Sequence, residues 1–277
     1  MTSNPRKRFF SILFQVLCIA AGCIVISPIL YAVSVSFMDS DQILNTELSL
    51  LPRRIQFENY KIALSTTPLI RYMWNSLVIA GSSSLIRVLT ASMAAFAFAF
   101  LTFRGKNVIF MLFMATIMVP ADCLLVTNYQ TVSKLGLINT YIGMMIVFCA
   151  SALNILMMRQ NFLSFSNELY DAANVDGCGN FRFFTRILLP LNKSVLTTVF
   201  ISAFIGTWNT YLWPMLVTNK NDMRTVQVGI TMLNFPDGTV YGPIMAAATI
   251  VLVPTILVFI IFKKQIVSGI MVGSVKG

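Results

Sequence analysis

The stretch DAANVDGCGNFRFFTRILLP, residues 171–190, decides the fold of this chain. It is polar and charged, and long apolar segments stand on both sides of it. Its spacing is distinctive: Asp-Ala-Ala at 171–173, a glycine at 177, an isoleucine at 187 and Leu-Pro at 189–190. A polar stretch between apolar segments of membrane-spanning length is typical of a loop that joins two transmembrane helices.

Composition also predicts a polytopic membrane protein. Of the 277 residues, 57% are hydrophobic and only 11% are charged, and the mean hydropathy is +0.78. A soluble domain usually carries about 25% charged residues. The net charge of +10 would also suit a nucleic-acid partner. However, the basic residues fall mainly in the connections between apolar stretches, as membrane topology requires, so we predict a lipid-membrane protein with no nucleic-acid partner.

Six stretches meet or approach the length of a spanning helix, which is roughly 20 mostly apolar residues. We expect the first to be a retained spanning helix and not a cleavable signal, because its apolar run continues from about Phe9 to Phe37, far beyond the about 7–15 residues of such a signal. We therefore expect an all-α fold in which residues 1–277 form a single transmembrane domain and residues 159–193 form a loop. The expected spans are 10–34, 74–102, 108–127, 138–158, 194–217 and 243–262.

The basic residues orient these spans. An even number of spans places both termini on one side of the membrane, together with the 159–193 loop. More of the Lys and Arg residues fall on that side than on the other, and basic residues accumulate on the cytoplasmic face. The sequence therefore predicts a multi-pass plasma-membrane protein with both termini and this loop in the cytoplasm.

The polar loop is expected to contain a short helix. Ser166 or Asn167 can cap its start, and the carboxylates of Glu168 and Asp171 lie in its first turns, where the helix dipole favours negative charge. Gly177 suits the left-handed conformation that ends many helices and in which a Cβ would be strained.

The residues of this helix leave two interpretations open. The small side chains of Ala172 and Ala173 would let the helix enter a cleft on another protein, and its carboxylates would offer that protein charge-assisted contacts. Alternatively, the helix would lie on the membrane surface, where Arg182 and Arg186 suit lipid headgroups.

The loop spacing resembles the cytoplasmic "EAA" motif of ABC-importer permeases, in which a short helix docks into an ATPase subunit. Three further segments resemble the carbohydrate-type permeases of the maltose class: KLGLINTYIG at 134–143, WNTYLWP at 208–214 and VGSVKG at 272–277. Two positions depart from the family pattern, since Asp171 replaces the usual glutamate and Cys178 replaces the usual alanine. The resemblance covers nearly the whole chain and implies the type I ABC-importer permease fold in a bacterial inner membrane.

This resemblance also implies partners and a cargo. A second permease subunit would complete a heterodimer, two copies of a cytoplasmic ATPase subunit would drive it, and an external solute-binding protein would deliver a carbohydrate. Glycerol-3-phosphate or another polyol-type solute is the alternative cargo. The implied ATPase-coupling residues are Glu168, Asp171, Ala172, Ala173, Asp176, Gly177, Ile187, Leu189 and Pro190. The implied ATPase-contacting tail consists of Ser274, Val275, Lys276 and Gly277.

The chain lacks the chemistry of an enzyme. It has no G-x-x-x-x-G-K-[ST] phosphate loop, so ATP and Mg would be bound by the partner ATPase. It has no histidine, the commonest general base, and its five cysteines form no CxxC pattern of a zinc site. We predict a transport subunit with no catalytic residue, metal or cofactor of its own. On residues alone, a secondary transporter or channel working by itself and a membrane scaffold remain open.

Polar and aromatic side chains at membrane depth are candidates for a solute pathway, because an ionisable group exposed to lipid is costly. The WNTYLWP segment combines amide and aromatic groups that suit sugars. In a continuous helix, Asn209 and Trp213 share one face, and Trp208 and Tyr211 another. The competing interpretations are interhelical amide bonds and an interfacial aromatic belt, and the belt is favoured for Trp213. Arg87 would snorkel or pair with a neighbouring helix. The pathway candidates are Asn75, Asp122, Asn128, Trp208, Asn209 and Tyr211.

Overall fold

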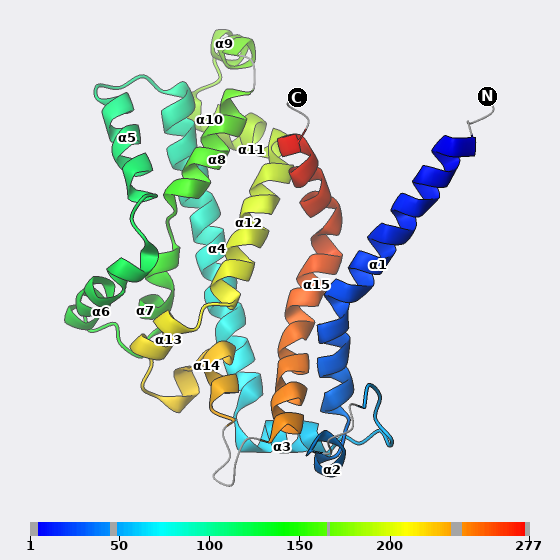
Figure 1. The fold of residues 1–277 in the computed structure, drawn as a ribbon. Helices are drawn as coiled ribbons and strands as arrows, with labels where there is room; N and C mark the ends of the chain where they lie inside the picture. Colours follow the sequence, from blue (N-terminus) through cyan, green and yellow to red (C-terminus); the bar gives the residue numbers. More distant parts are fainter. Residues whose placement is uncertain (1–4, 45–48, 165–166, 234–239, 275–277) are drawn as a thin grey trace. The chain divides into compact units, whose positions relative to one another are not determined.

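A computed structural model shows a chain built from helices (Figure 1). The structure describes residues 5–44, 49–164, 167–233 and 240–274, and no strand occurs within these ranges. The all-α prediction is therefore confirmed for the described chain.

The chain forms two compact units. The first unit comprises residues 1–69 and 230–253, and the second comprises residues 70–229 and 254–277. The last helix, α15 (Tyr241–Ser274), contains Pro254 and contributes to both units.

The first unit contains α1 (Pro5–Ser36), α2 (Ser40–Leu44) and α3 (Glu58–Thr66). The buried side chain of Asn59 fixes the end of α1, because its Nδ2 donates to the carbonyls of Ser36 (3.0 Å) and Met38 (2.7 Å). These hydrogen bonds satisfy carbonyl groups that the end of a helix leaves unpaired. Gly242 packs against the same side chain so closely that an added Cβ would lie 2.5 Å from the Asn59 Oδ1.

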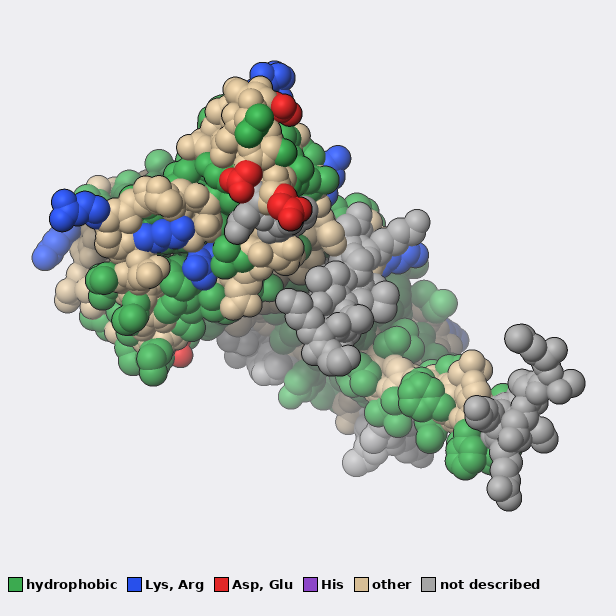
Figure 2. Space-filling model, turned by 90° about the horizontal axis from the view of Figure 1, so that it is seen from above, with side chains coloured by type: hydrophobic (Ala, Val, Ile, Leu, Met, Phe, Trp, Pro, Cys, Tyr) green, Lys and Arg blue, Asp and Glu red, His purple; other side chains and the backbone are tan. Residues whose placement is uncertain are grey.

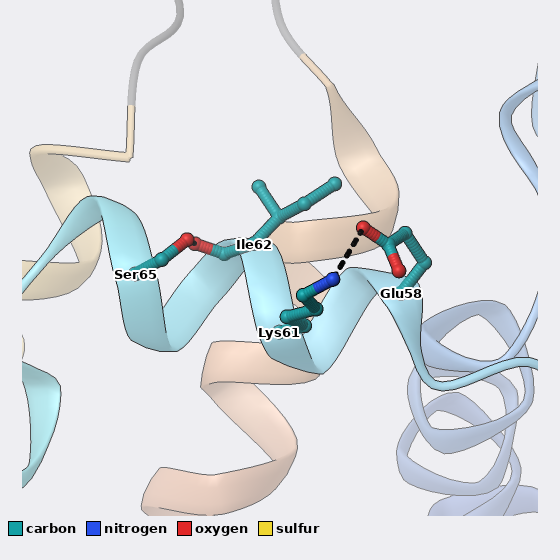
Figure 3. A network of polar contacts seen from close by, with 4 residues as sticks. All are labelled: Glu58, Lys61, Ile62 and Ser65. Atoms are coloured by element: carbon teal, nitrogen blue, oxygen red, sulfur yellow. Dashed lines mark hydrogen bonds and ion pairs between the residues drawn. The ribbon is translucent and has the colours of Figure 1, made fainter.

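The outer surface of α3 carries polar contacts of little energetic weight (Figure 3). Lys61 Nζ lies 3.9 Å from the Glu58 carboxylate, and both side chains are exposed. The Ser65 hydroxyl donates to the carbonyl of Ile62 at 3.1 Å. Because exposed ion pairs contribute about 0–1 kcal/mol, the buried side of α3, with Asn59 and Ala63, holds it in place.

The second unit contains a succession of long, short and irregular helices. Its long helices are α4 (Leu69–Phe100) and α12 (Lys193–Trp208). The other elements are α5 (Lys106–Thr116), η1 (Ala121–Leu124), α6 (Leu125–Lys134), α7 (Tyr141–Met145), η2 (Ile146–Phe148), α8 (Ala152–Leu163), α9 (Asn167–Val175), α10 (Asn180–Phe183), η3 (Phe184–Leu188), α11 (Leu189–Leu191), α13 (Leu212–Val217), η4 (Asn221–Met223) and α14 (Val226–Thr231).

The apolar helices allow three to six membrane spans. In the described part of the chain, three helices are long and apolar enough by themselves, and three bent pairs raise the number to six if each pair is one span. The single helices cover Phe9–Ser36, Leu69–Phe100 and Tyr241–Lys263. The bent pairs are Lys106–Thr116 with Ala121–Lys134 (94°), Tyr141–Phe148 with Ala152–Leu163 (49°), and Asn180–Leu191 with Lys193–Trp208 (79°).

An aromatic core in the second unit gathers the helix ends on which α9 rests. Phe96 and Phe98 of α4, Phe162 of α8 and Phe183 of α10 are all buried in it. The ring of Phe96 lies 5.3 Å from that of Phe184 and 6.3 Å from that of Phe183. This core joins the predicted polar loop to the long helices.

Candidate functional site

The helix α9 ends in a Schellman motif, as the glycine in the polar loop suggests. Gly177 has φ +71°, in the left-handed region. The N–H of Cys178 donates to the carbonyl of Ala173 (2.8 Å), and the N–H of Gly177 donates to the carbonyl of Asn174 (3.0 Å). This pair of bonds defines the motif and satisfies two terminal carbonyls. The predicted conformation of Gly177 is confirmed.

The inner side of α9 is fastened to its own unit. The ring of Tyr170 lies 5.1 Å from that of Phe100 and 5.0 Å from that of Phe183, and its hydroxyl bonds with the Asn180 Oδ1 at 2.7 Å. Ala173 is only 7% exposed and belongs to the aromatic core. The helix is therefore attached both to the end of α4 and to α10.

The outer side of α9 is acidic and exposed. Glu168, Asp171 and Asp176 are exposed, as is Ala172, and Val175 is 88% exposed. Within the described residues, no hydrogen bond or ion pair engages the three carboxylates. Figure 2 looks down on the end of the molecule that carries α9 and shows acidic side chains gathered there, with basic side chains around them.

The structure divides the predicted coupling residues into an outer and an inner group. Ala173 is buried in its own chain, so only Ala172 of the two alanines is free to face another protein. Ile187 and Leu189 are partly buried and pack against the aromatic core, whereas Pro190 is exposed. The expectation that both alanines enter a cleft on a partner is wrong for Ala173, because a helix with one face on a core turns one of two adjacent residues inward.

A π-helix and a buried amide connect this region to α12. The η3 segment is a π-helical turn, a feature that often marks functional sites. Asn192 follows directly after α11, and its Nδ2 donates to the carbonyl of Leu188, the last residue of η3, at 2.7 Å. The chain bends by 79° at this point. Asn192 and Tyr170 were not among the predicted site residues, although an asparagine two residues after the Leu-Pro of the loop is a visible signal of a helix break.

Two basic side chains close the end of α4 beside the aromatic core. Lys106 Nζ donates to the carbonyls of Leu101 (2.8 Å) and Ala99 (3.3 Å). Arg159 Nε donates to the carbonyl of Phe98 (3.1 Å), and its guanidinium lies 4.2 Å from the centroid of the Phe110 ring. Cations are favourable at a helix C-terminus, where carbonyls lack partners. These contacts tie Lys106 and the helix α8 to the end of α4, which α9 contacts through Tyr170.

A second candidate site is a hollow of about 590 Å³ in the second unit. It brings together Asp122 of η1, Asn128 of α6 and Tyr211 from the break between α12 and α13, three of the predicted pathway residues. No hydrogen bond or ion pair within the described chain engages these three polar side-chain groups. The full lining is Ala121, Asp122, Leu124, Leu125, Asn128, Val147, Phe148, Thr210, Tyr211, Leu212 and Trp213.

The other predicted pathway residues do not line this hollow. Asn75 is fully buried and fully bonded: its Nδ2 donates to the carbonyls of Asp222 and Arg224, both at 2.8 Å, and its Oδ1 accepts from the Tyr141 hydroxyl at 2.6 Å. An amide with such partners fixes a loop to a helix. Trp208 is 2% exposed, with its ring stacked 5.9 Å from that of Phe204.

Comparison with protein families identifies the chain. Residues 6–272 match the family model described as "Binding-protein-dependent transport system inner membrane component". The chain belongs to this family. It is therefore a permease subunit with a transport function, and the resemblance drawn from the loop motif is confirmed. A secondary transporter or channel that works alone does not belong to this family.

Named relatives cover almost the whole permease. The sn-glycerol-3-phosphate transport system permease protein UgpE of Brucella abortus (strain 2308) is 34% identical over 264 residues, covering 92% of this chain and 94% of the relative. The arabinooligosaccharides transport system permease protein AraQ of Halalkalibacterium halodurans is 31% identical over 258 residues, covering 92% of each chain.

A solved structure has the same fold. It is a chain of a bacterial ABC transporter involved in the import of the acidic polysaccharide alginate. The TM-score is 0.81 at 24% sequence identity, covering 95% of this permease and 99% of that chain. The predicted type I ABC-importer permease fold is thus confirmed at the level of the fold.

Two expectations for the WNTYLWP segment of this permease are wrong. The segment is not a continuous helix, since α12 ends at Trp208 and α13 begins at Leu212, so the predicted shared faces are wrong. The belt expected for Trp213 is also wrong: this side chain is 4% exposed, and its Nε1 donates to the carbonyls of Gly143 (3.2 Å) and Met144 (3.1 Å).

Three further expectations concern polar groups and the tail. Asn209 is exposed, and its Oδ1 accepts from Gln227 Nε2 at 3.3 Å, so it lies outside the hollow. Arg87 of α4 pairs with a neighbouring helix, one of its two expected outcomes, because its Nε donates to the carbonyl of Phe148 in η2. Ser274 ends α15. The remaining tail residues, Val275, Lys276 and Gly277, lie outside the described residues.

Proposed function

We propose that this permease subunit forms the membrane pathway of an ATP-driven ABC importer for a carbohydrate. It pairs with a second permease subunit, receives its solute from an external solute-binding protein, and is driven by two copies of a cytoplasmic ATPase that bind ATP and Mg. Membership of a binding-protein-dependent transport family supports this proposal. The relative named for arabinooligosaccharide transport supports the cargo class, and the lack of a phosphate-loop motif in the sequence supports a separate ATPase.

The proposed topology has six spans within one domain of residues 1–277, and both termini face the cytoplasm together with the 159–193 loop. The three long apolar helices and the three bent pairs lie over the six apolar stretches, which supports this number. The excess of basic residues on the side of the loop supports the orientation.

The observation that carries the proposal is the division of α9 into two faces. Its outer face offers Glu168, Asp171 and Asp176 without partners in the described chain. Its inner face is locked to α4 and α10 through Tyr170 and Ala173. A helix built in this way can receive a displacement from a partner and pass it to the long helices. We assign α9 as the ATPase-coupling helix, with Gly177, Ile187, Leu189 and Pro190 shaping and supporting it. The tail from Ser274 to Gly277 is a further proposed ATPase contact.

Charge reversal on α9 tests this assignment. The double variant Glu168→Lys/Asp171→Lys should reduce the amount of ATPase subunit that co-purifies with a tag on this chain by about tenfold or more, because two attractive contacts at an interface become repulsive. The matched control is Asp41→Lys/Glu58→Lys, which makes the same charge change at exposed positions of the first unit. Equal recovery of the ATPase with the α9 variant and with this control contradicts the proposal.

The hollow around Asp122, Asn128 and Tyr211 is the proposed part of the solute pathway. Its lining combines hydrogen-bonding groups with the aromatic rings of Phe148, Tyr211 and Trp213, the mixture that typically lines small-molecule sites. Glycerol-3-phosphate is the second candidate cargo, because relatives 34% identical to this chain carry that name.

A further inference from the structure

The charges around the hollow distinguish between these two cargo classes. Its lining contains one carboxylate, that of Asp122, and no Lys or Arg among the described residues. We infer that Asp122 makes the hollow select uncharged polyhydroxyl solutes, such as neutral oligosaccharides, and reject anionic ones such as phosphate esters and uronates. The inference rests on the proposed function, since it assigns a selectivity to the pathway proposed above.

The free polar groups of the hollow fit hydroxyl groups. The carboxylate of Asp122 only accepts hydrogen bonds, the amide of Asn128 both donates and accepts, and so does the hydroxyl of Tyr211. None of the three is engaged by another described residue. A sugar hydroxyl can donate to the carboxylate and exchange bonds with the other two groups, whereas a phosphate oxygen cannot donate to Asp122.

No basic side chain in the wall offsets the charge of Asp122. Arg87 of α4 lies behind the wall, where its Nε donates to the carbonyl of the lining residue Phe148; it is not part of the lining and forms no ion pair with Asp122. An anion inside the hollow therefore meets a carboxylate that has no ion pair in the described chain. Two like charges about 5 Å apart, screened as in water, lower the occupancy of the anion about fourfold.

The relatives sharpen this contrast. A glycerol-3-phosphate permease must stabilise a phosphate, for which arginine and lysine are the usual side chains. The hollow of this chain has the opposite charge. Identity of 34% to such permeases therefore describes shared descent, and the lining of the hollow favours an uncharged carbohydrate.

The first test measures the charge selectivity of the hollow directly. The importer complex is purified through a tag on this chain, its five cysteines are replaced by alanine, and Thr210→Cys places a reporter thiol in the lining. The modification rates of a cationic trimethylammonium and an anionic sulfonate methanethiosulfonate reagent are compared. Asp122→Asn should lower the cationic-to-anionic rate ratio about tenfold. The control Asp222→Asn removes an exposed carboxylate outside the lining and should leave the ratio unchanged. An unchanged ratio in the Asp122 variant overturns the inference.

The second test uses solutes of equal size and different charge. Maltotetraose should protect the thiol at position 210 from an uncharged methanethiosulfonate, and tetragalacturonate should protect it only after Asp122→Asn. Equal protection by both solutes with Asp122 present overturns the charge selectivity and leaves the hollow as a carbohydrate pathway. Protection by neither solute overturns the proposed pathway role of the hollow, and the inference with it.

Discussion

Tyr170 should control how firmly α9 is attached to the rest of the permease. Its ring makes contacts at 5.0 and 5.1 Å with Phe183 and Phe100, and its hydroxyl bonds with Asn180 at 2.7 Å. An aromatic pair contributes about 0.5–1.5 kcal/mol, and an intramolecular hydrogen bond about 1 kcal/mol. Because Tyr170 is only partly buried, we take the lower part of these ranges and expect Tyr170→Ala to weaken the attachment by about 2–3 kcal/mol.

Amide hydrogen exchange measures this loss. An attachment weaker by about 2–3 kcal/mol should speed local opening of α9 about 30- to 150-fold, provided that α9 opens as one unit. The informative amides are those of Cys178 and Asp176, which donate to the carbonyls of Ala173 and Ala172. Tyr170→Phe is the matched control, because it keeps the ring contacts and loses only the hydroxyl, so its exchange should rise by tenfold at most. ATP hydrolysis by the complex should persist in Tyr170→Ala while ATP-dependent uptake falls.

Equal exchange rates of these amides in Tyr170→Ala and in wild type would refute this prediction, since α9 would then be held by contacts other than the aromatic ones. Faster exchange with unchanged uptake would also refute it, because a less firmly attached α9 would then still pass on the displacement that it receives from the ATPase.

Two further predictions concern stability. Gly177→Ala should lower the free energy of unfolding by about 1–2 kcal/mol, because position 177 has φ +71°, and the thermal stability of the complex should fall with it. Gly179→Ala is the control. It should change the thermal stability little, because position 179 has φ −65° and open space around its Cβ position. Trp213→Phe should lower the free energy of unfolding by about 1–3 kcal/mol, because it leaves the carbonyls of Gly143 and Met144 without the indole donor. Trp74→Phe is the control: this side chain is 58% exposed, so the variant should stay near wild type in the same thermal measurement.

Features with a local cause were predictable from the sequence. The apolar stretches became helices because length and hydropathy act locally, and Gly177 took the left-handed conformation that a helix end requires. The acids of α9 are exposed because they are charged and lie beyond the apolar stretches. The family motif itself depends on this local pattern, which is why it could be read from the residues alone.

Features set by distant contacts were not predictable. WNTYLWP has the composition of a helix, yet Trp213 reaches the carbonyls of Gly143 and Met144, some 70 positions away in the chain. Asn75 looked like a pathway residue because an amide in an apolar span is costly, but the carbonyls of Asp222 and Arg224 satisfy it. Periodicity could not show that Ala173 rather than Ala172 turns inward, because both positions are small and apolar.

The helix α12 links the two candidate sites, and both lie in the second unit. It begins after Asn192, where the chain bends by 79°, and ends at Trp208, two residues before Thr210 of the hollow. Its 16 residues span about 24 Å without an internal break. A regular helix between two breaks carries a displacement from one end to the other, so motion of α9 should reach Tyr211 through the aromatic core and α12. The Tyr170→Ala variant therefore tests more than attachment. With α9 loosened, ATP should no longer change the modification rate of a cysteine at position 210, whereas it should do so when Tyr170 is intact.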